Sequence, residues 1–417
     1  MWDPGSGKIW ASCPANQVGD VDQYIESSQT AFDSFRHTKP RERAKILLKW
    51  HELITKAQED IAKIVVYETG KPMSEAVDEV DYALGFAWWF AGEAERVRGS
   101  IALPSVSSRR TFVIKQPIGV CVALVPWNFL VAMIIRQVAV AIAAGCTMVV
   151  KPSPETPLSV MALADLALRA GLPTGVLNII STSNEYTPSV SERLCKHLSV
   201  RKVTFTGSTI VGSIVAKHCA EGLKKVTMEL GGNCPFIVFE DGNLDEAVAA
   251  LMILKWRTAG QAFEKVERHV SDALSKGGKL LYGGKRPDHC KGGYFFEPTV
   301  VSGMSPDMLT TKEEIFGPLL GIYKFETEQE VVKLANHTSM GLASYFYTKD
   351  VSRTGRLLES LEAGMIGMNT GNASCAESPF GGIKASGYGK EAGKDVAIEE
   401  YLISKTGTLT VEAMTTA

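Results

Sequence analysis

Between residues 118 and 232, short apolar runs alternate with stretches of helical character, and this alternation limits the fold more than any other feature of the chain. Strands separated by helices need crossover connections, which are right-handed and produce a parallel sheet. The expected strands are Val120–Val125, Thr147–Val150, Val176–Ile180, Lys202–Phe205 and Lys225–Leu230, with helices at Val131–Ala144, after Pro157 and at Val211–Glu221. The sequence therefore predicts an α/β fold built on a parallel sheet.

The segments on either side of this region have other patterns. The N-terminal third is helical in pattern, with Pro40 at a helix start and Gly70 as a C-cap. Short extended runs around Ser107–Arg110 indicate a hairpin, and a second α/β segment begins at Pro235–Phe239 after a glycine pair. We therefore expect more than one domain, which a chain of 417 residues accommodates because single cores stop growing near ~250–300 residues.

Composition excludes several classes of protein. Apolar residues make up 45% of the chain and the net charge is −2, so neither a nucleic-acid surface nor a polybasic membrane surface is expected. The eight cysteines form no CxxC pair and no Cys/His spacing suited to zinc, so no metal site is expected. Most of them lie in apolar surroundings, which indicates buried, reduced thiols rather than a disulfide framework.

One stretch has the length of a membrane span. Residues 118–135 carry no charge, but Pro126-Trp127-Asn128 interrupts them and Arg136 follows directly. A buried strand, a polar turn and a helix start explain this pattern better, so we expect no membrane span and no membrane partner. The N-terminus shows no basic segment followed by an apolar run, and we therefore expect no targeting peptide.

A glycine turn follows the expected strand Lys202–Phe205. Gly207, Ser208 and Gly212 join this strand to the next helix, and the N–H groups of such a helix start favour a pyrophosphate. The alternative is an ordinary strand-to-helix turn, since the motif is neither a Walker loop nor the usual dinucleotide fingerprint.

Polar residues also follow other strand ends. Asn128 could aim its amide at a developing oxyanion, with a turn-forming asparagine as the alternative. Lys151 lies where ligand crevices form in parallel sheets, with a solvated lysine as the alternative. Glu229 ends an apolar strand, where burial should raise its pKa toward that of a general base.

Two further motifs are too particular to be ordinary loops. They are Glu313-Glu314-Ile315-Phe316-Gly317-Pro318 and Ser378-Pro379-Phe380-Gly381-Gly382-Ile383-Lys384-Ala385-Ser386-Gly387. Together with the glycine turn and Met228-Glu229-Leu230-Gly231-Gly232, and in this order, they resemble the aldehyde dehydrogenase superfamily over nearly the whole chain. The run from Gly364 to Gly389 and Glu399–Leu402 look most like the succinate-semialdehyde dehydrogenase branch.

This resemblance implies an aldehyde dehydrogenase-like fold. It would comprise a Rossmann-type cofactor domain at 1–99 and 118–231, an α/β catalytic domain at 232–387, and a β-hairpin oligomerisation arm at 100–117 and 401–412. The resemblance also implies a homo-dimer or homo-tetramer. The expected location is cytoplasmic, with a mitochondrial one as the alternative because the family's first motif lies so close to residue 1.

The resemblance also implies site residues. Asn128 would donate to an oxyanion, Glu229 would activate the deacylating water, and Arg136 and Arg257 would bind a substrate carboxylate through charge-assisted hydrogen bonds. A structural salt bridge is the alternative for either arginine. The implied cofactor contacts are Trp127, Lys151, Ser153, Gly207, Ser208, Gly212, Glu314 and Phe316. The cofactor would be NAD or NADP, since Pro154 replaces an acidic residue that often binds the adenosine ribose.

The chain departs from the family at the nucleophile. Family members carry the catalytic cysteine directly after the position matched by Ala262, whereas here Phe263 follows and opens an amphipathic helix. The family reaction needs that thiolate, because the aldehyde is oxidised as a covalent adduct that water then hydrolyses. Cys375 and Cys234 are the alternative thiols, but an accidental replacement would have to meet strict geometry.

Three interpretations follow. In the first, the protein is an NAD(P)-dependent aldehyde dehydrogenase for succinate semialdehyde or a similar carboxylate-bearing aldehyde, and the segment with the cysteine is missing from this sequence alone. In the second, the chain is a non-catalytic protein that binds cofactor or assembles with intact homologues. In the third, the chain is an unstable remnant, because the missing strand and helix would open the sheet of the catalytic domain and expose its core. In each case, we predict that the literal 417-residue chain does not oxidise aldehydes appreciably.

Overall fold

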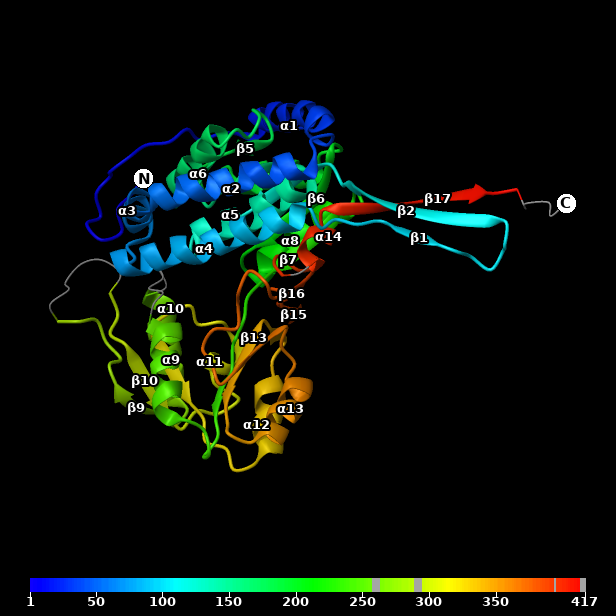
Figure 1. Cartoon of the computed structure of the whole chain (residues 1–417). Helices are drawn as coiled ribbons and strands as arrows, with labels where there is room; N and C mark the ends of the chain where they lie inside the picture. The colour runs from blue at the N-terminus through cyan, green and yellow to red at the C-terminus, as the bar shows by residue number, and fades with distance from the viewer. Residues whose placement is uncertain (257–262, 289–294, 394, 413–417) are drawn as a thin grey trace.

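The computed structural model describes residues 1–256, 263–288, 295–393 and 395–412. These residues form two α/β lobes and an extended arm that projects from the side of the first lobe (Figure 1). In Figure 1 the first lobe lies above the second, and the arm points to the right.

The first lobe opens with helices. After the short 3-10 turn η1 (Val18–Asp20) they are α1 (Val21–Phe35), α2 (Pro40–Lys56), α3 (Gln58–Thr69) and α4 (Met73–Ala94). Pro40 occupies the first turn of α2, and Gly70 ends α3 in the left-handed conformation with φ of 72°. Both helix boundaries predicted from the sequence are therefore confirmed.

A six-stranded sheet forms the centre of this lobe, in the order β16-β7-β6-β3-β4-β5. Its strands are β3 (Val120–Leu124), β4 (Thr147–Lys151), β5 (Leu177–Ile179), β6 (Val200–Thr206), β7 (Lys225–Glu229) and the late strand β16 (Gly387–Tyr388). The first five run parallel and β16 pairs antiparallel to β7, which confirms the predicted parallel sheet.

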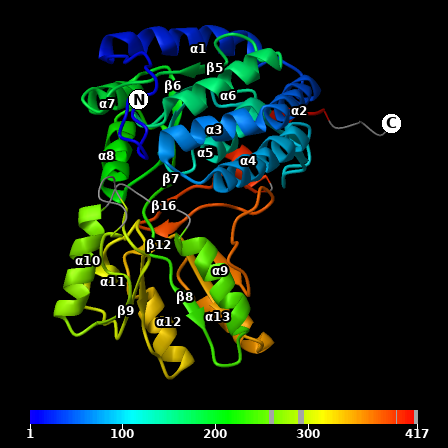
Figure 2. The same cartoon turned by 90° about the vertical axis from the view of Figure 1, so that its left-hand side faces the viewer.

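Helices cover both faces of this sheet (Figure 2). The crossover helices are α5 (Leu130–Ala144), α6 (Pro157–Arg169), α7 (Thr187–Lys196) and α8 (Thr209–Ala220). Every residue of α5 is buried, because the helix is enclosed by α2, α4, α6 and the sheet. The uncharged stretch 118–135 is thus divided into β3, a turn and α5, and no helix in the described ranges has the length and apolarity of a bilayer span.

The second lobe contains two separate three-stranded sheets. One has the order β14-β13-β8 and comprises β8 (Phe236–Val238), β13 (Ala343–Tyr347) and β14 (Met365–Met368). The other has the order β11-β10-β9 and comprises β9 (Lys279–Tyr282), β10 (Thr299–Ser302) and β11 (Leu319–Ile322). Each sheet has its own apolar core.

Short helices surround these sheets. They are α9 (Leu244–Trp256), α10 (Phe263–Ser275), α11 (Leu309–Lys312), α12 (Glu328–Asn336) and α13 (Val351–Ser360), while α14 (Val396–Glu399) returns the chain to the first lobe. The two-residue strands β12 (Met340–Gly341) and β15 (Ile383–Lys384) pair near the junction of the lobes.

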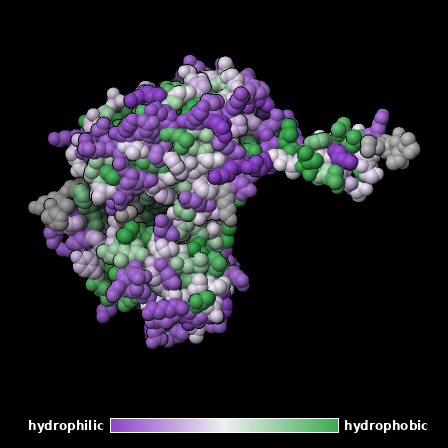
Figure 3. Space-filling model, viewed as in Figure 1, coloured by the Kyte–Doolittle hydropathy of each residue, from purple (hydrophilic) through white to green (hydrophobic). Residues whose placement is uncertain are grey.

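The arm is a third sheet, in which β2 (Arg109–Pro117) lies between β1 (Ser100–Ala102) and β17 (Leu402–Thr410). The register pairs Phe112 with Gly407 and Ile114 with Lys405, so side chains at even positions of β2 share one face with those at odd positions of β17. Large apolar side chains on this face are exposed: Ile101, Phe112, Ile114, Ile403 and Leu409. In the space-filling view, apolar atoms gather on the surface of the arm (Figure 3).

Candidate active site

The carboxyl ends of four adjacent parallel strands bring most of the predicted site residues together. Trp127 and Asn128 follow β3, and Lys151 and Ser153 lie at the end of β4 and just beyond it. Because β7, β6, β3 and β4 are neighbours in that order, the turns that follow them lie along one edge of the sheet. This edge is where ligands bind in open parallel sheets.

The glycine turn after β6 leads directly into α8. The Gly207 N–H donates to the Glu229 carbonyl at 3.0 Å, which ties the turn to the end of β7. The Ser208 side chain caps α8 by accepting from the Val211 N–H at 3.4 Å. A Cβ at Gly212 would lie 2.4 Å from the Leu230 side chain, so this glycine lets α8 approach the sheet closely.

The first turn of α8 is open to solvent, since the Ile210 side chain is 78% exposed. A helix start of this kind presents N–H groups and the positive end of the helix dipole to an anion. The turn therefore fits a phosphate-bearing cofactor, and Gly207 and Ser208 lie where they would line it.

Lys151 is buried beside this edge. Its Nζ donates to the Pro152 carbonyl at 2.8 Å, and burial lowers the pKa of the ammonium to about 8, an effect that the nearby Glu155 carboxylate partly offsets. The Ser153 hydroxyl donates to Glu155, whose second oxygen lies 3.5 Å from the Asn184 amide nitrogen. Glu155 thus supplies a carboxylate next to Ser153, although Pro154 occupies the position where the family often has an acidic residue.

Residues of the second lobe reach the same edge. Glu314 accepts from the Gly232 N–H at 3.0 Å, and its pKa is raised by burial. Phe316 has a φ of 51°, and its ring lies 6.0 Å from that of Trp127 at an interplanar angle of 61°. The motif around Glu314 therefore closes over the end of the sheet from the side of the second lobe.

The turn that holds Asn128 is fixed by two charged residues far away in sequence. Lys71 Nζ donates to the Asn128 carbonyl at 2.9 Å and pairs with Glu79, while the Val131 N–H donates to Glu79 at 2.8 Å. The Asn128 side-chain oxygen is buried without a hydrogen-bond partner in the part of the chain that the structure describes. Sequence analysis missed Lys71 and Glu79, because nothing local marks them as neighbours of residue 128.

Glu229 is the most unusual group of the site. It is 2% exposed, and neither carboxylate oxygen has a hydrogen-bond partner among the described residues. Burial raises its pKa well above the ordinary value, and the nearby Glu391 carboxylate raises it further. The positive charges of Arg136 and Lys390 oppose the shift, as does the Gly382 N–H, which lies near the carboxylate without the geometry of a full hydrogen bond. A Cβ at Gly381 would lie 2.6 Å from the carboxylate, so the glycine-rich segment 378–387 packs directly on it.

A buried carboxylate that sequence analysis missed lies beside Glu229. Glu391 pairs with the Arg136 guanidinium at 2.7 Å and accepts from Gln137 at 2.8 Å and from the Thr204 hydroxyl at 2.9 Å. The only available signal was its place four residues beyond the end of the 378–387 motif, in Gly389-Lys390-Glu391.

Arg136 is thereby held in a defined orientation. Its guanidinium carbon lies 4.0 Å from the centre of the Phe380 ring, the side chain is buried, and its Nε has no partner within the described ranges. The structure therefore places Arg136 near Glu229 and pairs it with Glu391, which is the salt bridge that the sequence analysis gave as the alternative to substrate binding. Arg257, the second predicted arginine, lies outside the described residues, as do Gln261 and Ala262.

None of the cysteines that the structure describes donates a hydrogen bond to Glu229 or to the side-chain oxygen of Asn128. Cys121, Cys146, Cys195 and Cys219 are buried in the cores of the first lobe. Cys375 is exposed and its thiol lies 3.1 Å from the Ser378 hydroxyl. Cys234 is also exposed as a residue, although the protein atoms packed around its sulfur raise the pKa of the thiol.

Comparison with known proteins agrees with this geometry. The chain matches the aldehyde dehydrogenase family over residues 1–262 and 261–406. It is 41% identical over 451 aligned positions to the mitochondrial succinate-semialdehyde dehydrogenase of Rattus norvegicus, with 96% of this chain and 86% of the rat protein covered. The alignment is longer than the 417-residue chain, so the rat protein has residues with no counterpart here.

Solved structures are similar over the whole chain. The crystal structure of an NADP-dependent enzyme of Escherichia coli superposes with a TM-score of 0.95 at 39% identity, covering 99% of this chain and 94% of the other. A betaine aldehyde dehydrogenase of Staphylococcus aureus, solved in complex with NAD⁺, superposes with a TM-score of 0.94 at 27% identity, covering 100% of this chain and 92% of the other. From its fold, its site and these similarities, the chain belongs to the aldehyde dehydrogenase family.

Proposed function

We propose that this chain has the active-site framework of an NAD(P)-dependent aldehyde dehydrogenase that oxidises a carboxylate-bearing aldehyde, such as succinate semialdehyde, to the acid. We further propose that the 417-residue polypeptide binds the cofactor but does not turn the aldehyde over. The observation that carries the proposal is the buried, unpartnered Glu229 carboxylate at the sheet edge where the cofactor residues gather.

The cofactor part of the proposal rests on the open start of α8. Ser208 and Gly207 would hold the pyrophosphate, Lys151 and Ser153 the adenosine ribose, and Glu314 and Phe316 the nicotinamide side. The bound cofactor supplies the hydride acceptor. The E. coli relative is NADP-dependent and the S. aureus relative was solved with NAD⁺, so both cofactors occur among similar proteins.

Two residues would carry the chemistry that this chain retains. The Asn128 side-chain amide would donate to the oxygen on which negative charge develops. Glu229 would accept a proton from the water that attacks the acyl group, a role that suits a carboxylate whose pKa is raised by burial.

The nucleophile is what this chain lacks. Ala262 is followed by Phe263, and the family match is broken into two parts at this point. The greater length of the alignment with the rat enzyme supports a missing segment. Without a thiolate, the retained donor and base have no covalent adduct on which to act.

The substrate class rests on the two arginines and on the rat relative. A guanidinium binds a carboxylate through paired, charge-assisted hydrogen bonds. Arg136 could take this role with its unpartnered Nε, while Glu391 holds the rest of the group in place. If Arg136→Ala and Arg257→Ala, made in a version with the cysteine-bearing segment restored, leave the preference for succinate semialdehyde over butyraldehyde unchanged, the substrate assignment is wrong.

Cofactor binding is tested on the purified chain, and the missing segment is tested on its transcript. NADH fluorescence titration should show saturable binding, which Gly212→Leu should abolish because the new side chain would force α8 away from Leu230. Sequencing the transcript across Gln261–Phe263 then distinguishes a sequence that has lost a segment by misjoining from a true deletion. Absence of cofactor binding by a folded chain would contradict the proposal.

We also propose a homo-dimer or homo-tetramer joined through the arm, because the apolar face of β2 and β17 is exposed in one copy. The proposed location is the cytoplasm, on the basis of the unpaired cysteines. The rat relative is a mitochondrial protein by name, so a mitochondrial location is the alternative that cell fractionation would decide.

A further inference from the structure

Helix α6 begins at the sheet edge that carries the proposed adenosine contacts, but its own sequence does not cap it. Thr156 is the N-cap residue, yet its side chain makes no cap bond, and its buried hydroxyl has no hydrogen-bond partner in the described ranges. Pro157 follows and has no N–H, so Leu158 and Ser159 carry the first backbone donors of the helix. Donors in a packed position of this kind need an acceptor from elsewhere in the chain.

Glu68, 90 residues before Leu158, supplies that acceptor. The Leu158 N–H donates to one carboxylate oxygen at 2.6 Å and the Ser159 N–H to the other at 3.1 Å, and the Ser159 hydroxyl donates as well. Glu68 lies at the end of α3 and is 4% exposed. A carboxylate at a helix start is stabilised by the charge-assisted bonds and by the positive end of the helix dipole. Glu68 therefore acts as the N-cap of α6.

The turn held by this cap carries a residue proposed to contact the adenosine ribose. Between β4 and α6 the Thr156 N–H donates to the Ser153 carbonyl at 3.1 Å, and the Ser153 hydroxyl donates to Glu155. One end of the turn is fixed by β4, which has a partner strand on each side, and the other end by the start of α6. The position of Ser153 therefore depends on the cap that Glu68 provides.

A second carboxylate from the same corner of the chain caps the neighbouring helix in the same manner. Phe129, the N-cap residue of α5, makes no side-chain cap bond, and the Val131 N–H donates to Glu79 of α4 at 2.8 Å. Glu68 and Glu79 thus come from the two helices that meet at the corner between α3 and α4. Helix α8, in contrast, is capped by its own Ser208. The repeated use of this corner indicates that it, rather than local sequence, sets where these two turns lie.

We propose that Glu68 is a positioning residue for cofactor binding, which holds the Ser153 turn where the adenosine ribose would bind by capping α6 from α3. This role rests on the proposed function, since it needs the turn to contact a dinucleotide. Glu68 would act through the turn rather than touch the cofactor. Its loss should therefore weaken the adenosine half of the contact without removing any group that the cofactor touches.

The test measures binding of AMP, the adenosine half of NAD, through its displacement of fluorescent NADH from the purified 417-residue chain at pH 7.5. At this pH the Glu68 carboxylate, whose pKa is raised by burial to about 7, is mostly ionised, and Lys151, whose pKa is about 8, is mostly protonated. Glu68→Ala should weaken AMP and NADH by the same factor, at least about tenfold, because the loss is confined to the adenosine half. Adenosine 2′,5′-bisphosphate and NADPH serve in a parallel titration, since the cofactor is NAD or NADP.

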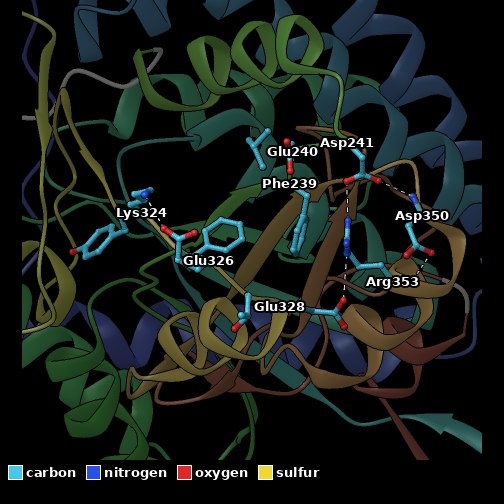
Figure 4. A pocket seen from close by; sticks show the side chains of 12 residues that line it. Phe239, Glu240, Asp241, Lys324, Glu326, Glu328, Asp350 and Arg353 are labelled. Atoms are coloured by element: carbon cyan, nitrogen blue, oxygen red, sulfur yellow. Dashed lines mark hydrogen bonds and ion pairs between the residues drawn. The ribbon is translucent and has the colours of Figure 1, made fainter.

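Two further variants separate this role from a general loss of stability. Glu68→Gln keeps an acceptor oxygen for one backbone N–H, so its AMP affinity should lie between those of the parent and Glu68→Ala. Asp350 caps α13 in the second lobe by accepting from the Ser352 and Arg353 N–H groups at 2.8 and 3.1 Å. Figure 4 shows Asp350 beside a cavity of about 680 Å³, close to Arg353. Asp350→Ala therefore removes a carboxylate cap from a helix outside the cofactor lobe and should leave AMP affinity unchanged.

Native-state hydrogen exchange at the Leu158 and Ser159 amides reports the cap directly. Exchange at these amides should be faster by about tenfold or more in Glu68→Ala and should keep the parent rate in Asp350→Ala.

Parent AMP affinity in a folded Glu68→Ala, or an equal loss of affinity in Asp350→Ala, would overturn the proposal and leave the proposed function intact. If Glu68→Ala does not fold, Glu68→Gln decides, because parent affinity in that variant has the same meaning. A folded parent chain that binds neither NADH nor NADPH would contradict the proposed function, and this positioning role with it.

Discussion

At the scale of single residues, burial determines the protonation of the charged groups in the site more than their position in a motif does. Glu229 is buried without a partner, and the neighbouring Glu391 carboxylate keeps a second negative charge close to it. Two carboxylates in one buried site cannot both ionise easily, so a proton is retained there in the folded state. Lys151 shows the opposite case, in which burial makes an ammonium easier to deprotonate.

Replacement of Glu229 by glutamine should change how stability depends on pH. The folded-state pKa of Glu229 is raised, so the folded protein holds a proton that the unfolded chain releases, and the free energy of unfolding falls as pH rises from about 4.5 toward the folded pKa. Glutamine does not titrate, so the free energy of unfolding of Glu229→Gln does not fall in this way. Chemical denaturation should find that the stability of the variant relative to the parent increases as pH rises from about 4.5 to 8. The exposed Glu359→Gln is the control, and a pH-independent difference for Glu229→Gln would contradict the prediction.

Replacement of Lys151 by methionine should weaken cofactor binding and remove its pH dependence. The pKa of Lys151 is about 8 in the free protein, so the cation is present below that pH and is lost above it. NADH affinity should therefore fall as pH rises beyond about 8, and Lys151→Met should bind roughly tenfold or more weakly at pH 7, with little further change at higher pH. Fluorescence titrations at pH 7 and 9.5 measure this. Lys217→Met, an exposed lysine on α8, should behave like the parent, and a parental pH profile in Lys151→Met would exclude the role of Lys151.

At the scale of helices and strands, the arm shows how a local pattern produces an interface. Pairing of β2 with β17 places Phe112, Ile114 and Leu409 on one face, while Thr111 and Thr408 pair on the other. An isolated copy leaves this apolar face in water, and burying each large side chain against a partner would contribute about 1.5–3 kcal/mol.

A charge on this face should therefore break the assembly. Ile114→Glu should shift the protein toward monomer in sedimentation velocity, with at least about a tenfold weaker association, because the carboxylate would have to be buried. Thr408→Glu lies on the opposite face and should assemble as the parent does. If both variants sediment alike, the arm is not the interface.

Prediction from sequence succeeded for the helices and strands, because the residue patterns that indicate them are local. Pro40 and Gly70 mark helix ends by their backbone preferences, and the apolar runs of β3 and β4, separated by a helical pattern, indicate buried strands of a parallel sheet. Glu391, Lys71 and Glu79 escaped prediction because they act through contacts with residues far away in sequence. The division of the second lobe into two sheets was beyond sequence reasoning for the same reason, since the pairing of edge strands is a non-local property.

At the scale of the whole molecule, the two lobes differ in completeness. The first has one continuous six-stranded sheet with helices on both faces, and the residues proposed to bind the cofactor lie at its edge. The second is divided into two small sheets with separate cores, and the family match is broken within it. This asymmetry fits the proposal that the chain keeps a cofactor site in the first lobe and lacks the step that needs a thiolate.

The most direct test of this account adds succinate semialdehyde and NAD⁺, or NADP⁺ in a parallel assay, to the purified 417-residue protein. Reduced cofactor is followed by absorbance and covalent adducts by intact-protein mass spectrometry. We predict no reduced cofactor above the level of a Glu229→Ala control and no acyl adduct, while NADH still binds. Sustained reduction of the cofactor, or an acyl group on any of the eight cysteines, would contradict the account.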